Sequence, residues 1–92
     1  MFRTRWYNRG RVLSDEGYSV ESGRDWLVYR RASRRMTVTV DQGSREINVF
    51  VSTANRWDDA PSSEVDESTK AAILNDIRRA LEWQGLKVNL LP

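Results

Sequence analysis

The sequence predicts an α+β fold, in which one long amphipathic helix packs on one face of an antiparallel sheet of four to five strands and a short C-terminal strand follows. Three patterns lead to this fold class. Apolar and polar residues alternate along 36–41 and again along 46–51, which is the period of a strand with one buried face. Apolar residues recur at spacings of three and four between about Glu64 and Gln84, as on one side of a helix. Residues 86–90 alternate again, directly after Gly85.

The N-terminal half supplies the expected strands in chain order. Residues 1–15 have no clean period, so we expect either an arm or an extra strand there. Residues 18–22 and 25–30 are rich in β-branched and aromatic side chains, which suit a pleated, half-buried surface. The segments 36–41 and 45–52 flank a glycine-containing turn and therefore predict a hairpin.

The predicted helix follows a long stretch without any period, residues 52–68, which we expect to be a loop. Ser63 and Asp66 are the candidate N-caps of the predicted helix, because short polar side chains accept hydrogen bonds from the first free N–H groups of a helix. Gly85 is placed to end the helix as a C′ glycine.

The composition limits the function. With 92 residues, the chain is expected to form a single domain that spans 1–92. It has no cysteine and no histidine, which excludes disulfides, thiol chemistry and most hydrolase active sites. No segment approaches the roughly 18 apolar residues of a membrane span. The arginine-rich N-terminus also lacks the apolar stretch of a secretory signal, so we expect a cytoplasmic protein without a membrane partner.

Cofactor and metal sites are not expected either. The sequence has no glycine-rich phosphate loop, and its acidic residues lack the spacing of an EF-hand. We therefore expect no cofactor, no metal and no enzymatic activity.

Arginines gather at the tip of one expected hairpin. Arg30, Arg31, Arg34 and Arg35 flank Ala32 and Ser33 in the stretch "RRASRRM", where we expect all of them to be exposed. Charged residues at a turn commonly serve solubility and oppose edge-to-edge pairing. Arginine forks also bind phosphate and carboxylate, so this turn is the alternative binding site, for nucleic acid or for an acidic protein surface.

Acidic residues gather in the loop before the helix and around the helix start. We take this loop, with its tryptophan, as the leading partner-binding site: Trp57, Asp58, Asp59, Glu64, Asp66 and Glu67. The carboxylates suit a basic partner surface such as the cleft of a nuclease. Trp57 either caps the core or provides an aromatic contact to the partner, whereas Trp26 and Trp83 are expected in the core or at its edge.

Three stretches carry a resemblance to a known family. "SGRDWLVYR" (Ser22–Arg30), "NRWDDAP" (Asn55–Pro61) and "DIRRALEWQG" (Asp76–Gly85) resemble, in order and spacing, the bacterial immunity protein 74 family. That family is found beside polymorphic and contact-dependent growth-inhibition toxins. The resemblance covers about residues 18–90. It implies a protein that binds and neutralises one cognate toxin domain, expected to be a nuclease, without catalysis. The alternative function is a small nucleic-acid-binding module that uses the arginine-rich hairpin and the N-terminal arm.

Overall fold

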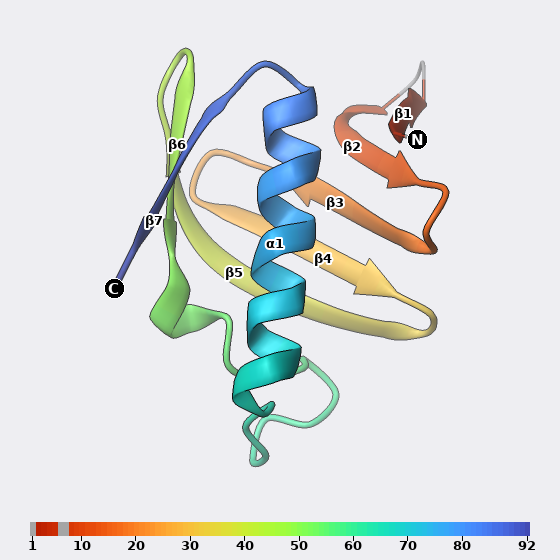
Figure 1. The fold of residues 1–92 in the computed structure, drawn as a ribbon, viewed down its shortest axis with the longest axis vertical. Helices are drawn as coiled ribbons and strands as arrows, with labels where there is room; N and C mark the ends of the chain where they lie inside the picture. The colour runs from red at the N-terminus through yellow and green to blue at the C-terminus, as the bar shows by residue number, and fades with distance from the viewer. Residues whose placement is uncertain (1, 6–7) are drawn as a thin grey trace.

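The computed structural model describes residues 2–5 and 8–92, with the surroundings of the side chains described from Arg11 onward. In these residues one α-helix lies across a curled sheet of seven strands, so the molecule has two layers (Figure 1). The strands are β1 (Phe2–Arg5), β2 (Asn8–Ser14), β3 (Tyr18–Ser22), β4 (Trp26–Arg31), β5 (Arg34–Gln42), β6 (Glu46–Phe50) and β7 (Lys87–Leu91). The helix is α1 (Glu67–Trp83), and a short 3-10 helix, η1 (Val51–Thr53), follows β6.

The sheet confirms the α+β class but has more strands than the four to five that the sequence predicts. The additional strands come from residues 2–14, where backbone pairing rather than a hydrophobic period defines β1 and β2. Val12 of β2 pairs with Val20 of β3, and both side chains are buried. The N-terminal segment is therefore part of the sheet.

The sheet is mixed, because the predicted C-terminal strand, whose direction the sequence left open, joins it in parallel. Strands β1 to β6 pair antiparallel in chain order, whereas β7 lies parallel to β6, with Glu46 opposite Lys87 and Phe50 opposite Leu91. The physical reason is the connection between β6 and β7. It runs through α1 across the face of the sheet, and a crossover of this kind joins parallel strands.

The helix is shorter than predicted, because it begins at Glu67 and not near Glu64; it has 17 residues. Asp66 has an extended backbone, and its carboxylate accepts a hydrogen bond from the backbone N–H of Thr69 at 2.7 Å. This residue is therefore the N-cap, and Ser63 is not. Gly85 follows the helix end with a φ of +89°, as predicted. No helix of the described residues is both long and apolar enough to cross a bilayer.

The core lies between the sheet and α1, and it confirms the alternating pattern of the second hairpin. Met36, Val38 and Val40 of β5 and Ile47 and Val49 of β6 are each at most 3% exposed. The helix contributes one buried stripe at spacings of three and four, formed by Ile73, Ile77, Ala80 and Leu81. This packing fixes the orientation of α1 relative to the sheet.

The expectation that two tryptophans lie in the core or at its edge is wrong. Trp26 is 44% exposed and Trp83 is 47% exposed. Trp26 precedes buried Leu27 on β4, so it points to the opposite face of the sheet, where its ring lies over Gly23. Trp83 follows buried Leu81 by two positions, which on a helix is a rotation of about 200° away from the core.

Candidate functional site

The β4–β5 hairpin brings the four arginines together at one end of the sheet. Arg31 pairs with Arg34 and Arg30 with Arg35, and Ala32 takes a positive φ of 55° in the two-residue turn. The expectation that this tip is exposed is confirmed for residues 31–35, while Arg30 is half-buried. Because side chains alternate along a strand, Arg31 and Arg34 lie on the helix side of the sheet and the other two lie on the open side.

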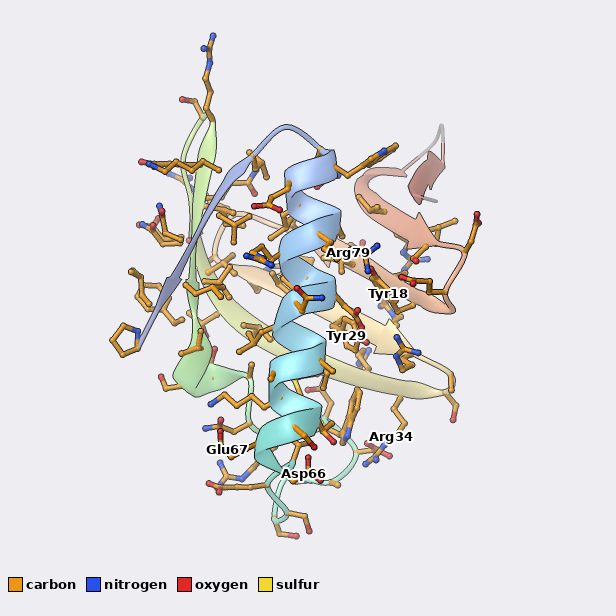
Figure 2. The ribbon with its side chains drawn as sticks, viewed as in Figure 1. Tyr18, Tyr29, Arg34, Asp66, Glu67 and Arg79 are labelled. Atoms are coloured by element: carbon orange, nitrogen blue, oxygen red, sulfur yellow. The ribbon has the colours of Figure 1, made fainter. Side chains whose placement is uncertain are left out.

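On the helix side, the exposed Arg31 joins a polar cluster with the buried Tyr29 and the partly buried Asp76. The hydroxyl of Tyr29 donates to Oδ2 of Asp76 at 2.7 Å, and Nε of Arg31 donates to the same hydroxyl at 2.9 Å. Nη2 of Arg31 reaches Asp76 at 3.1 Å, and its guanidinium also lies 5.3 Å from the ring centroid of Tyr18. Figure 2 shows Tyr29 between α1 and the sheet. The cluster therefore ties the turn to the helix.

The environment of Tyr29 raises its pKa to about 12. Burial is the main cause, because the side chain is 0% exposed and a phenolate would lose its hydration. The carboxylate of Asp76 acts in the same direction, and the guanidinium of Arg31 opposes both. The Tyr29 hydroxyl therefore remains a hydrogen-bond donor throughout the physiological pH range.

Trp57 packs against the core and also contacts the guanidinium of Arg34. Its half-buried ring packs against the core, with its centroid 6.1 Å from that of Tyr29. The guanidinium of Arg34 lies 4.8 Å from the Trp57 ring centroid, a cation–π distance, and its Nη2 is 3.3 Å from Asp59. Of the two roles that the sequence left open for Trp57, the capping role is seen. The role in a partner contact stays a prediction.

On the open side of the sheet, the other two arginines also lie against carboxylates. Nη1 of Arg30 is 3.0 Å from Glu21, which also receives Arg11 at 3.1 Å. Nε of Arg35 is 3.1 Å from Asp58. Each arginine of the turn is therefore paired with an acidic residue from another segment.

Asp58 covers the part of the β5 edge that β6 leaves open. The ladder between β5 and β6 spans only 40–42 of β5. Before it, the carboxylate of Asp58 accepts from the N–H and the hydroxyl of Thr37 at 3.0 and 2.8 Å, and its own N–H donates to the carbonyl of Arg35 at 2.7 Å. Thr53 accepts from the N–H of Thr39 at 2.9 Å. The loop thus takes the place of a neighbouring strand, and the hydrogen bonds of Asp58 to β5 hold it there.

The other acidic residues of the leading site do not extend it into one acidic surface. Glu64 is paired with Arg56 at 3.1 Å, and Asp66 is occupied as the helix cap. Hydrogen bonds from Thr69, joined by one from Ser68, hold the pKa of Asp66 below its ordinary value. Glu67 is exposed in the first helical turn and lies, in the view of Figure 2, across the helix start from Arg34. The structure therefore brings together Trp57, Asp58 and Asp59 with the arginine turn, and leaves the other three predicted residues apart.

The arginine turn and two residues of the leading site, Asp58 and Asp59, line one open hollow of about 400 Å³ at the tip of the hairpin. Its lining residues come from the turn and from the loop: Arg30, Ala32, Ser33, Arg34, Arg35, Asp58 and Asp59. We call these residues, together with Trp57, the turn–loop surface. A second hollow of about 280 Å³ lies on the helix side, between Trp57, Asp76 and the first turns of α1.

Sequence reasoning missed the contribution of Tyr29 and Asp76. The available signal was Asp76 itself, an acidic residue between Ile73 and Ile77 on the flank of the apolar stripe of the helix. A carboxylate at that position faces the sheet and needs a donor there, which Tyr29 and Arg31 of β4 provide.

The described residues contain no group of three His, Cys, Asp or Glu side chains that could hold a metal ion. No family model matches the chain, and no curated protein or solved structure gives a significant match. The resemblance to immunity protein 74 therefore stays a prediction.

Proposed function

We propose that this protein is an immunity protein that binds and neutralises a cognate toxin domain in the cytoplasm, without catalysis. The observation that carries the proposal is that the two predicted binding segments, the arginine turn and the acidic loop, lie side by side and form ion pairs with each other. Arg34 pairs with Asp59, and Arg35 with Asp58, so a partner that contacts one segment meets the other. The binding site is therefore the whole turn–loop surface, and the acidic loop and the arginine turn are not competing alternatives.

The chemistry of this surface suits a protein partner. Arginine and tryptophan are the side chains that most often dominate protein–protein affinity. The exposed fractions of the Arg34, Arg35 and Asp59 side chains are 43%, 58% and 63%, so both signs of charge are available to a partner. A complementary toxin surface would offer carboxylates and basic groups side by side, which favours selective recognition of one partner.

Internal pairing also favours binding by lowering its entropic cost. A long arginine side chain loses rotamer freedom when a partner immobilises it. Arg34 is already held between the ring of Trp57 and the carboxylate of Asp59, so much of that ordering is present before binding. The surface is thus arranged in advance for a partner.

The nucleic-acid-binding alternative has less support. Non-specific binding to nucleic acid depends on arginines and lysines that are free to replace counterions on phosphates. In the turn, Arg30, Arg34 and Arg35 each lie within 3.3 Å of a carboxylate oxygen. Phosphates would have to compete with those carboxylates, so the turn is a poor phosphate-binding site.

The proposal is tested by calorimetric titration of the protein with the purified toxin domain encoded in the neighbouring reading frame. We expect the wild type to bind and Arg34→Glu to weaken binding at least tenfold. The new carboxylate would repel Asp59, and the cation–π contact with the Trp57 ring would be lost. Arg45→Glu, in the turn that joins the other end of β5 to β6, is the matched control and should bind like the wild type. Binding that survives Arg34→Glu unchanged, or an absence of binding with the wild type, would contradict the proposal.

A further inference from the structure

The strand β7 forms one end of the sheet. The strand order is β1 to β7, and β7 pairs with β6 alone among the described residues. Figure 1 shows it at the left margin of the molecule, far from the β4–β5 turn at the right. Any interaction along this edge is therefore separate from the turn–loop surface.

The pairing of β7 with β6 fixes which backbone groups face outward. The N–H of Lys87 donates to the carbonyl of Arg45 at 2.9 Å, so Lys87 directs its backbone groups toward β6. Backbone groups alternate in direction along a strand, so Asn89 and Leu91 also face β6. Val88 and Leu90 then present their N–H and C=O groups to the open edge.

The side chains at this edge are apolar and incompletely covered. In the parallel register Val88 lies beside Ile47 and Leu90 beside Val49, and both β6 residues are 0% exposed. Leu90 is nevertheless 44% exposed, although it belongs to the core side of the sheet. Among the described residues, the core layer thus has no neighbour beyond β7.

The chain protects another open edge but not this one. Along the first half of β5, the side chains of Asp58 and Thr53 occupy the backbone N–H groups that no strand takes. Natural sheets block exposed edges with such groups, or with prolines, bulges and inward-pointing charges. Between Lys87 and Leu91 the strand has no proline, no bulge and no inward-pointing charge, and its one charged residue, Lys87, directs its backbone groups toward β6. The two outward-facing residues, Val88 and Leu90, carry no such device, so this part of the edge can accept another strand.

We propose that this edge pairs antiparallel with β7 of a second copy of the chain, about a two-fold axis at Asn89. In this register Val88 of each copy lies opposite Leu90 of the other. Val88 and Leu90 are the residues whose N–H and C=O groups face outward. In this register the N–H and C=O of Val88 in one copy bond to the C=O and N–H of Leu90 in the other. Centring the pair on Leu90 would instead place Val88 opposite Pro92, which has no N–H to donate.

The side chains agree with the same register. Opposite residues share a face in an antiparallel pair, so the exposed Leu90 packs on Val88 of the second copy, on the core side of both sheets. Lys87 lies opposite Leu91, which keeps the lysines of the two copies apart. A five-residue edge buries far less than the roughly 1,200 Å² of a stable interface. The dimer is therefore reversible and dependent on concentration.

Sedimentation velocity over a series of protein concentrations tests the proposal. The wild type should shift from the mass of one chain to twice that mass as concentration rises. Leu90→Pro should remain a monomer at every concentration, because it removes an outward N–H that the β6–β7 ladder does not use. The matched control is Trp26→Gln, which removes an equally exposed apolar side chain from β4 and should still dimerise.

Hydrogen exchange on the wild type keeps the test decisive if Leu90→Pro does not fold. The amides of Val88 and Leu90 should exchange more slowly at high than at low concentration, whereas Asn89 should change little. A wild type that is monomeric throughout would overturn the proposal. So would a dimer that survives in folded Leu90→Pro, or one whose concentration-dependent protection lies outside β7.

Discussion

Replacing Asp58 with alanine should loosen the loop from the edge of β5 and destabilise the whole domain. Its carboxylate accepts the N–H and the hydroxyl of Thr37 and pairs with Arg35. No other side chain of the described residues covers the N–H of Thr37. Alanine would leave that N–H to water and remove the ion pair.

The expected loss in the free energy of unfolding is about 2 kcal/mol. Each of the two hydrogen bonds from Thr37 contributes about 0.5–1 kcal/mol at this partly exposed position. The ion pair with Arg35 adds about 0.5 kcal/mol, since exposed pairs contribute little. A loss of this size is a substantial part of the roughly 5–15 kcal/mol that stabilises a typical domain.

Urea denaturation followed by circular dichroism measures this loss, with Asp59→Ala as the matched control. Asp59 makes one exposed ion pair, with Arg34, and its removal should change the free energy of unfolding by about 0.5 kcal/mol or less. If Asp58→Ala is no more destabilising than Asp59→Ala, the argument that Asp58 fastens the loop is wrong.

Substitutions at three further positions test local features of the fold. Ala32→Gly should raise the free energy of unfolding, measured by urea denaturation, by about 1 kcal/mol, because glycine adopts the positive φ of 55° without strain. Tyr29→Phe should lower it by about 1–2 kcal/mol, since Asp76 loses the hydroxyl donor. The raised pKa of Tyr29 means that its contribution is present below its ordinary value of 10 and is lost as pH rises through about 12, so Tyr29→Phe should flatten this alkaline loss. Asp66→Ala should lower the thermal midpoint at neutral pH, while Asp66→Asn, which still caps, should not.

The outcomes that would contradict these expectations are specific. An unchanged or lower stability of Ala32→Gly would mean that the turn gains nothing from glycine. An alkaline loss that persists in Tyr29→Phe would place its origin in another group. The lowered pKa of Asp66 gives a contribution that is present above the ordinary value of 3.8 and lost as pH falls through the folded-state value. Asp66→Ala should therefore be less sensitive to acid than the wild type, and equal acid sensitivity would contradict the capping argument.

The fold was predictable wherever a hydrophobic period marks an element. Alternation gave the β5–β6 hairpin, and the three–four spacing gave α1 with Gly85 at its end. The period is absent from β1 and β2, which are defined by backbone pairing with their neighbours, so the sequence left them as an arm or a strand. The direction of β7 was also not predictable from its own residues, because it follows from the path of α1 across the sheet.

The candidate site was predictable in its parts and not in its assembly. Composition alone marked the arginines of the turn and the acidic residues of the loop. Their union depends on the short ladder between β5 and β6, which leaves an edge that Asp58 and Thr53 can occupy. A pairing between residues more than twenty positions apart, such as Arg34 with Asp59, carries no local signal in a single sequence.

The central claim, that the turn–loop surface neutralises a toxin, is tested most directly by growth of bacteria that express the C-terminal domain of the protein encoded in the neighbouring reading frame, which is the proposed toxin. Cells that carry the wild-type protein or Arg45→Glu should grow, and cells that carry Arg34→Glu at the same level of folded protein should not. Equal protection by Arg34→Glu and the wild type would contradict the claim and would require a binding surface elsewhere on the molecule.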